Sequence, residues 1–261
     1  MMSHEYQKIP LQRLEDDQYH IESECIVQES IITLHSIGKD GLYESHTSLL
    51  GTPTEINELH IGHLLCEGLT KVIPSINDFK FMTQDGIINS YYNSILSNVP
   101  EPRLITTSCG ACNHPDLSVD QIHGIQSSIS QQLTHKQLKQ ALDEMKAQMK
   151  LFSTTGGCHG AALFDSSGSV RFVSEDIGRH NAVDKTVGLA ILSGLHSFHN
   201  HTLLLSGRCG WDIVAKASRI GISSIASVGA FSTAALDLAR QNGITLYGFV
   251  RETGAWKAGV N

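Results

Sequence analysis

The spacing of apolar residues predicts an α/β fold for the second half of the chain. Five short runs rich in β-branched and apolar residues have the length of buried strands. They are residues 161–164, 170–173, 202–205, 224–227 and 245–250. The predicted helices cover residues 134–151, 181–195, 211–219 and 232–242. Strands that alternate with helices in this order are typical of a sheet covered by helices.

The first half of the chain has a weaker pattern, which indicates a smaller α+β unit. Residues 25–33 favour a strand, and a helix is expected after Thr52, with Thr52 or Thr54 as its N-cap and Pro53 in its first turn. We therefore divide the chain into three parts. These are a loosely ordered lead-in at 1–20, a smaller α+β domain at 21–130 that ends in a cysteine-bearing loop, and an α/β domain at 131–261.

Composition narrows the class of protein. The chain has 261 residues, of which 41% are hydrophobic and 17% charged, as expected for a soluble globular protein. Its formal net charge of −7 argues against nucleic acid as a partner. No apolar stretch approaches the roughly 20 residues that span a membrane, and the N-terminus lacks the apolar core of a signal peptide. We expect a cytoplasmic protein whose thiols stay reduced.

Residues 108–112 read SCGAC, a CxxC pair formed by Cys109 and Cys112 within a polar segment that favours a loop. In a reducing compartment such a pair indicates sulfur or redox chemistry, because a thiolate is a strong nucleophile and the second thiol can resolve what the first carries. The alternatives are half of a zinc site and incidental loop cysteines. A zinc site needs more ligands; the chain has no second CxxC, although Cys158, His159 and Cys209 could supply ligands in space.

Three glycine-containing segments favour a site for an anionic ligand. Gly156 and Gly157 precede a predicted strand, and their backbone N–H groups could turn toward a ligand. Arg179 and His180 come just before a helix, and Arg208 follows a strand, with Lys216 further along the next helix. Loops at the ends of strands in α/β sheets commonly bind phosphates. The alternatives are a tight turn at the glycines and a solvated capping segment at Arg179.

Taken together, these residues resemble the FdhD family, the formate dehydrogenase accessory sulfurtransferases. The matching stretches are residues 52–68, 108–112, 153–185, 206–208 and 243–251. The resemblance implies a cytidine-deaminase-like layered α/β core with a smaller N-terminal α+β domain, and a homodimer. It implies a persulfide carrier that takes sulfur from a cysteine desulfurase to the molybdenum cofactor, bis(molybdopterin guanine dinucleotide), before the cofactor enters formate dehydrogenase.

The resemblance also implies roles for individual residues. Cys109 would bear the persulfide, with Cys112 as its partner. Residues of the C-terminal segment would contact the cofactor, and these are Phe249, Val250, Arg251, Glu252, Thr253 and Gly254. The anion-binding candidates Gly156, Gly157, Arg179, His180, Arg208 and Lys216 would complete that site. The cofactor is a bound substrate here, and no dedicated protein-bound metal is expected.

Two other classes of function compete with this interpretation. A zinc nucleobase deaminase would carry H-x-E and P-C-x-x-C on two helices. Here the corresponding helices begin at His180 without a following glutamate and near Cys209 with a single cysteine, so that class is poorly supported. The second alternative is a non-catalytic chaperone that binds the molybdenum cofactor for formate dehydrogenase, because the same residues would serve it.

Overall fold

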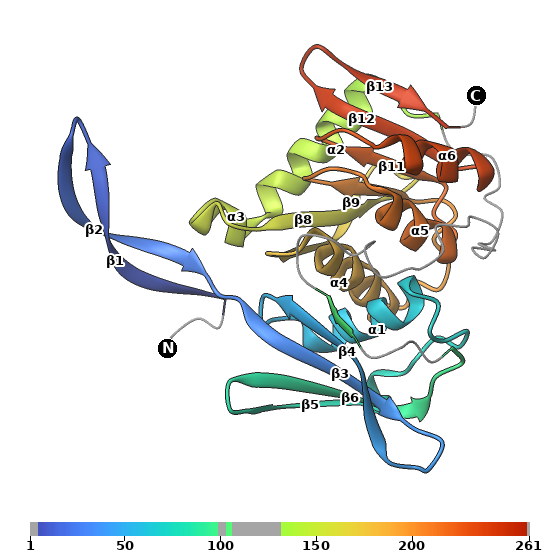
Figure 1. Ribbon diagram of the computed structural model, residues 1–261. Helices are drawn as coiled ribbons and strands as arrows, with labels where there is room; N and C mark the ends of the chain where they lie inside the picture. The colour runs from blue at the N-terminus through green and yellow to red at the C-terminus, as the bar shows by residue number, and fades with distance from the viewer. Residues whose placement is uncertain (1–4, 99–102, 106–131, 260–261) are drawn as a thin grey trace.

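The computed structural model describes residues 5–98, 103–105 and 132–259, and the CxxC pair Cys109 and Cys112 lies outside these ranges. The described chain builds a layered body from which one β-hairpin projects (Figure 1). The α/β class predicted from the sequence is confirmed. The boundary expected between residues 130 and 131 borders the undescribed segment 106–131 and stays a prediction.

The larger sheet has six strands in the order β13-β12-β11-β10-β8-β9. Strands β10, β11 and β12 run parallel, whereas β8, β9 and β13 pair antiparallel with their neighbours. The strands are β8 (His159–Phe164), β9 (Val170–Asp176), β10 (Thr202–Leu205), β11 (Ser224–Ser227), β12 (Thr245–Arg251) and β13 (Gly254–Ala258). The predicted runs 202–205 and 224–227 coincide with β10 and β11, because both are short and buried along their whole length.

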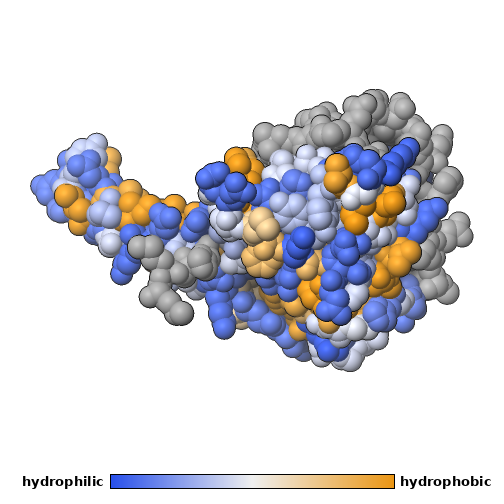
Figure 2. Space-filling model, turned by 90° about the horizontal axis from the view of Figure 1, so that it is seen from below, coloured by the Kyte–Doolittle hydropathy of each residue, from blue (hydrophilic) through white to orange (hydrophobic). Residues whose placement is uncertain are grey.

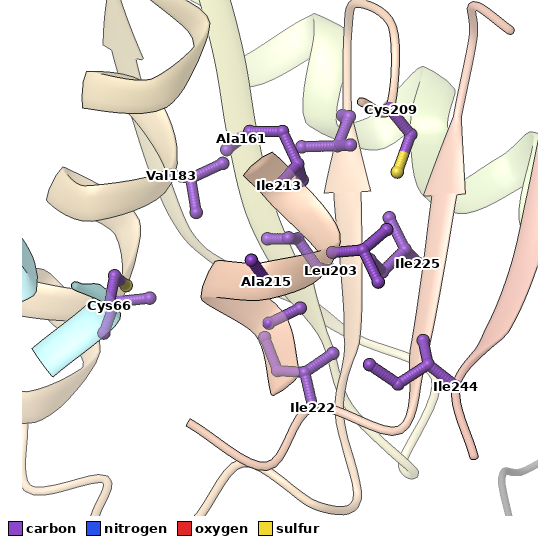
Figure 3. Close-up of a cluster of buried hydrophobic side chains, with 14 of the residues drawn as sticks. Cys66, Ala161, Val183, Leu203, Cys209, Ile213, Ala215, Ile222, Ile225 and Ile244 are labelled. Carbon is purple, nitrogen blue, oxygen red and sulfur yellow. The ribbon is translucent and has the colours of Figure 1, made fainter. Parts of the chain in front are cut away.

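Helices cover both faces of this sheet. On one face lie α4 (Arg179–Leu192), α5 (Trp211–Arg219) and α6 (Thr233–Gln241), and on the other α2 (His135–Gln148), followed by α3 (Lys150–Thr155). Alternate strand residues supply the two cores: Leu203 packs with α4 and α5, whereas Leu204 packs with α2. Figure 3 shows the first of these cores, in which side chains from the helices meet those of the sheet.

A second sheet of five strands lies beside α4, with α1 (Ile56–Cys66) between them. Its order is β5-β6-β3-β4-β7, and its strands are β3 (Ser30–Ile37), β4 (Tyr43–Gly51), β5 (Phe79–Gln84), β6 (Ile87–Ile95) and β7 (Arg103–Ile105). A short 3-10 helix (Ile76–Asp78) precedes β5. Helix α1 buries Ile56 and Leu59 against the sheet and turns its opposite side to α4.

Two glycines allow α1 and α4 to pack backbone against backbone. A Cβ atom on Gly62 of α1 would lie 1.7 Å from the carbonyl oxygen of Asp184, and one on Gly188 of α4 would lie 1.9 Å from that of Glu58. Any side chain at either position would separate the helices. This contact joins the two sheets into one body.

The start of α1 differs from the prediction. Its N-cap is Glu55, at a positive φ of 52° and without a side-chain capping bond. Thr52 instead uses its hydroxyl to accept a hydrogen bond from the backbone of Ile177, and its own N–H donates to Asp176. The threonine is therefore committed to the neighbouring layer, which a local capping rule cannot anticipate.

The N-terminal residues form a hairpin where a loosely ordered lead-in was expected. Strands β1 (Tyr6–Glu15) and β2 (Gln18–Val27) pair along ten residues each. Asp16 and Asp17 at the tip both have positive φ, as a two-residue type I′ turn requires. In Figure 1 this hairpin, called the arm below, points away from the body.

Candidate functional site

The predicted ligand-binding segments meet at one edge of the six-stranded sheet. Because β10, β11 and β12 are parallel, the loops that follow them leave from the same edge. Strand β8 runs the opposite way and begins at that edge, and β9 ends there. The edge therefore gathers residues 156–159, 176–180, 206–210, 228–231 and 249–254.

Backbone hydrogen bonds hold these loops side by side. The N–H of Gly229 donates to the carbonyl oxygen of Gly207 at 3.1 Å, and the N–H of Phe249 donates to that of Gly229 at 3.0 Å. The Ser206 side chain accepts a hydrogen bond of 2.9 Å from the N–H of Gly160. A Cβ atom on Gly229 would lie 2.8 Å from the Gly207 oxygen, so this glycine permits the close approach of the two loops.

Cationic groups gather at this edge. His159 begins β8, and its pKa is lowered by burial and by the nearby charges of Arg179 and Arg208. Helices α4 and α5 both start here, and their N-cap residues Gly178 and Gly210 provide no side-chain cap. Two helix N-termini without side-chain caps and two guanidinium groups, of which that of Arg179 lies 3.7 Å from the Asp212 carboxylate, form a place suited to phosphate oxygens.

A cavity of about 560 Å³ opens beside these loops, under α2. Its walls are mostly apolar and include Met145 of α2, Met149 between α2 and α3, and Val250 of β12. Polar groups line the rest, including Lys139, Lys146, Gly156, Gly157, His159 and Ser206. A mainly apolar pocket with a few polar groups is the usual form of a site for a small molecule or cofactor.

A second cavity, of about 460 Å³, lies around the β12–β13 turn. It is lined by Phe249, Arg251, Thr253, Gly254, Ala255 and Trp256. Trp256 is 71% exposed and Phe249 40% exposed, and the Arg251 guanidinium lies 5.3 Å from the centre of the Phe249 ring. Exposed rings beside an arginine can stack on a planar heterocycle.

The β12–β13 turn is tied to the start of α2. Glu252 forms a 2.8 Å ion pair with Lys139, and the carbonyl oxygen of Arg251 lies 2.7 Å from Nε2 of His135. The backbone N–H of Leu133 donates to the hydroxyl of Tyr247. Helix α2 therefore connects the two cavities: it lines the first, and it is bonded to the turn that lines the second.

The side chains of His180 and Lys216 are engaged in buried pairs. His180 pairs through Nε2 with Asp212, and burial lowers its pKa to about 4, so it is neutral near pH 7 and donates its N–H to the carboxylate. Lys216 is buried and makes ion pairs of 2.8 Å with Asp184 and 2.7 Å with Glu67. Its ammonium is thus engaged inside the protein. A cavity of about 20 Å³, near the size of one water, lies between these groups.

The geometry of the α4 start depends on one buried carboxylate. Asp176 accepts hydrogen bonds from the backbone of Thr52 at 3.0 Å and of Gly178 at 2.7 Å, and it accepts one from the Asn181 amide at 3.0 Å. The Lys185 ammonium forms an ion pair of 2.8 Å with the same carboxylate. These contacts orient the turn that presents Arg179.

Three of the described cysteines are poor nucleophiles. Cys66, Cys158 and Cys209 are buried, and burial raises the pKa of each thiol. Cys158 lines the larger cavity, yet its Sγ donates to Glu175 at 3.3 Å, and that carboxylate raises the thiol pKa further. A protonated thiol neither attacks a persulfide nor binds a metal readily.

The CxxC begins close in sequence to a part of the molecule that the structure describes. Strand β7 ends at Ile105, four positions before Cys109, and Ile105 pairs with Leu49 of β4. Leu49 lines the small cavity together with His180. Within residues 5–98, 103–105 and 132–259, no three His, Cys, Asp or Glu side chains are arranged to hold a metal ion.

Some site residues were not predicted. His159 was considered only as a zinc ligand, and Trp256 was not selected, although an exposed tryptophan next to the predicted 249–254 segment is a detectable signal.

Among the described helices, none has the length and apolar character needed to cross a bilayer.

Comparison with known proteins gives a consistent family assignment. The model of the FdhD/NarQ family matches residues 28–256. The sulfur carrier protein FdhD of Picrophilus torridus is 38% identical over 208 residues, which cover 78% of each chain. That of Thermoplasma acidophilum is 33% identical over 234 residues, covering 88% of this chain and 83% of the relative. A crystal structure of a "putative formate dehydrogenase accessory protein" from Desulfotalea psychrophila has the same fold, with a TM-score of 0.72 at 22% identity over 97% of this chain and 96% of the other.

Proposed function

Because this chain belongs to the FdhD/NarQ family, we propose that it is a sulfur carrier that supports formate dehydrogenase. In the finer form of the proposal, Cys109 accepts sulfur from a cysteine desulfurase and delivers it to bis(molybdopterin guanine dinucleotide). The names of the two relatives described above support the carrier role. The reaction needs a compartment in which thiols stay reduced, such as the cytoplasm.

The loading step is a thiol–persulfide exchange. The Cys109 thiolate attacks the terminal sulfur of the donor's cysteine persulfide, the donor's S–S bond breaks, and the donor cysteine leaves as a thiolate. Cys109 then carries one additional sulfur. No net oxidation takes place, because one S–S bond replaces another.

The partner thiol provides a route for release. Attack of the Cys112 thiolate on the Cys109 sulfur forms a disulfide and expels the terminal sulfur as hydrosulfide, which can become a ligand of molybdenum. A cellular dithiol must reduce the disulfide before the next cycle. Cys66, Cys158 and Cys209 are less suited to either step, because burial raises the pKa of each thiol.

The observation that carries the cofactor half of the proposal is the meeting of Arg179 and Arg208 with the N-termini of α4 and α5 at one sheet edge. Pyrophosphate groups suit such a place because it offers both positive charge and the backbone N–H groups of two helix starts. The flanking cavities of about 560 and 460 Å³ fall in the range of small-molecule sites. They are lined in part by Gly156, Gly157, Phe249, Val250, Arg251, Thr253 and Gly254, whereas Glu252 pairs with Lys139 and lines neither cavity. Lys216 has no part in this form of the site.

Sulfur loading can be tested directly. The purified protein is incubated with a cysteine desulfurase and isotopically labelled cysteine, and peptides are examined by mass spectrometry before and after strong reduction. We expect one added sulfur, about 32 Da, on the peptide bearing Cys109, lost on reduction. The Cys109→Ala variant must lose it, whereas Cys158→Ala must keep it. Labelled sulfur that persists in Cys109→Ala would disprove the carrier assignment.

The same variant separates the carrier from the cofactor chaperone. If Cys109→Ala binds the cofactor normally but leaves formate dehydrogenase inactive, sulfur transfer is the essential step. If it supports full formate dehydrogenase activity, the protein acts by binding and protecting the cofactor, and the sulfur step is not required.

A further inference from the structure

A carboxylate stands among the cationic groups of the sheet edge. Asp212 is the second residue of α5, and its Oδ2 lies 3.7 Å from the Arg179 guanidinium and pairs with Nε2 of His180. The Asp212 side chain is only 12% exposed, so water screens its charge weakly. A negative charge at this place opposes the binding of a negative ligand, although the rest of the edge favours one.

Two contacts hold this carboxylate in position. His180 is neutral near pH 7, because burial lowers its pKa to about 4, and its Nε2–H donates to Oδ2 of Asp212. The other oxygen, Oδ1, lies over the start of α5, where a Cβ atom on the N-cap Gly210 would collide with it. The positive end of the helix dipole favours a carboxylate there. Asp212 therefore stays in place whether or not a ligand is bound.

Arg179 is the member of this group that can change partner. Its separation of 3.7 Å from Asp212 exceeds the length of a hydrogen bond, so charge attraction alone holds the guanidinium there. The Arg179 side chain is 20% exposed, and a loose ion pair of this kind is weak. A phosphate oxygen can offer the guanidinium a directed, charge-assisted hydrogen bond instead. The carboxylate and a phosphate therefore compete for one guanidinium group.

Arg208 gives a comparison within the same site. Its charge and that of Arg179 both lower the pKa of His159, which places the two arginines near the same imidazole. In the part of the chain that the structure describes, ion pairs to carboxylates are formed by Arg179 and by other arginines but not by Arg208. A ligand thus meets the full charge of Arg208, whereas the charge of Arg179 is partly neutralised.

A competing carboxylate suits a protein that must give up its cargo. In closely related complexes, affinity is adjusted mainly through the rate of dissociation. When a phosphate leaves Arg179, Asp212 is already in place to restore a counter-charge, so the guanidinium is not left unpaired in a partly buried place. The carboxylate therefore favours release over long retention.

Building on the phosphate site of the proposed function, we propose that Asp212 is an internal competitor of the bound anion. It holds Arg179 in the empty protein, yields it to a phosphate group of the cofactor, and takes it back as the cofactor leaves. Asp212 is thus a positioning residue, which acts on the ligand through Arg179.

Asp212→Asn tests the competition, because the amide has the size of the carboxylate and can still accept from His180 but carries no charge. Guanosine diphosphate with a fluorescent N-methylanthraniloyl group is the probe, and stopped-flow mixing gives its rates. Asp212→Asn should bind the probe about tenfold more tightly, mainly through slower dissociation. Asp40→Asn removes an exposed carboxylate from the turn between β3 and β4, and its affinity should stay within about twofold of the wild type.

Double variants separate competition for Arg179 from general repulsion of the ligand. In an Arg179→Ala background, the gain from Asp212→Asn should fall to about threefold or less, because the shared guanidinium is absent. In an Arg208→Ala background, the gain should remain about tenfold, because Arg208 has no part in the pair. Far-UV circular dichroism and thermal melting should show that every variant is folded.

Two results would overturn the role of Asp212. One is an Asp212→Asn protein that binds the probe no more tightly than the wild type. The other is a tenfold gain that persists without Arg179, since it would come from general repulsion. A wrong phosphate site has a different signature: Arg179→Ala and Arg208→Ala would then bind the probe as well as the wild type, and the role of Asp212 would be refuted with it.

Discussion

Lys185 and Asp176 form an ion pair with a 2.8 Å contact, and both side chains are completely buried. The ammonium group also donates to the carbonyl oxygen of Thr52 at 3.1 Å. Asp176 in turn receives the N–H of Thr52 and that of Gly178. This ion pair thus connects the end of β4, in the five-stranded sheet, to the start of α4, whose first residue is Arg179.

Breaking this pair is expected to be costly. Lys185→Met leaves the Asp176 carboxylate buried without its counter-charge, so we expect the free energy of unfolding to fall by about 3–5 kcal/mol. Urea denaturation followed by circular dichroism measures the change. Lys8→Met, at an exposed position, should shift it by less than about 0.5 kcal/mol. A loss below about 1 kcal/mol for Lys185→Met would show that the pair contributes little.

The close contact between α1 and α4 predicts that one added methyl group at Gly62 strongly destabilises the protein. The Cβ of Gly62→Ala would meet the Asp184 carbonyl oxygen at 1.7 Å, and a backbone atom within a packed helix cannot swing aside. We expect a destabilisation of at least about 1–3 kcal/mol in thermal or urea unfolding. Gly38→Ala is the control, because its 2.5 Å neighbour is the end of the flexible Glu44 side chain. Equal stabilities for the two variants would contradict the close helix contact.

The cationic edge predicts how the protein should bind a guanine nucleotide. Arg179→Ala and Arg208→Ala should each weaken binding of guanosine diphosphate by about 10- to 100-fold, since each removes a charge-assisted hydrogen bond to phosphate. Isothermal titration calorimetry measures the affinity. Arg171→Ala removes an exposed arginine near the opposite end of β9 and should leave the affinity unchanged. Equal losses in all three variants would indicate a general effect of charge and not a site.

The sequence predicted the sheet well where strands are buried on both faces. Runs such as 202–205 are continuous and apolar because helices cover both sides of β10. The arm gave no such signal, since Leu14, Tyr19 and Ile21 are separated by charged residues and nothing within the described chain covers them. Strands that no other layer of the described chain covers show no regular alternation of buried and exposed positions, and in Figure 2 hydrophobic and hydrophilic residues are interspersed along the arm.

The site was predicted loop by loop, but its assembly was not. Arg179 and Arg208 are suggestive in sequence because each lies between a strand and a helix. His159 lies near them because β8 runs antiparallel to β10, and the local sequence pattern does not specify that strand direction. The sequence places Lys216 with the two arginines as an anion-binding candidate, because it lies on the helix that follows Arg208. Its partner Glu67 lies far away in the chain, so no local rule would reveal the buried pair.

The buried thiols predict a selective pattern of alkylation. Cys158 and Cys209 should react with iodoacetamide in the folded protein at least about 100-fold more slowly than after unfolding in urea, because their raised pKa values and burial suppress the thiolate. Mass spectrometry of quenched samples at pH 8 gives the rate for each cysteine. Fast labelling of Cys158 in the native protein would make it a competing candidate for the sulfur carrier.

Buried histidines predict a loss of stability in mild acid. His46 and His60 lie together between β4 and α1, with 3.4 Å between their Nε2 atoms. Burial, followed by the neighbouring histidines, lowers the pKa of His46 to about 3 and lowers that of His60 as well. Other groups facing them are His63, which pairs with Asp184 across the layer, and the Ser90 hydroxyl.

The sign follows from proton uptake. Above pH 6.5 these imidazoles are neutral in both states, so their full contribution to stability is present. As the pH falls below 6.5, the unfolded chain binds protons that the folded chain refuses, and the free energy of unfolding decreases by up to about 1.4 kcal/mol per pH unit for each such histidine. The loss for His46 continues until its folded pKa near 3.

A comparison of variants isolates this contribution from that of the carboxylates, which titrate in the lower part of the same range. His46→Gln should flatten the plot of unfolding free energy against pH between about pH 6 and 4, by about 1.4 kcal/mol per unit relative to the wild type. His196→Gln, at an exposed position, should run parallel to the wild type. Urea denaturation at half-unit pH intervals gives the slopes. If His46→Gln also runs parallel, the imidazole gains its proton as easily in the folded protein as in the unfolded chain, and burial does not govern its titration.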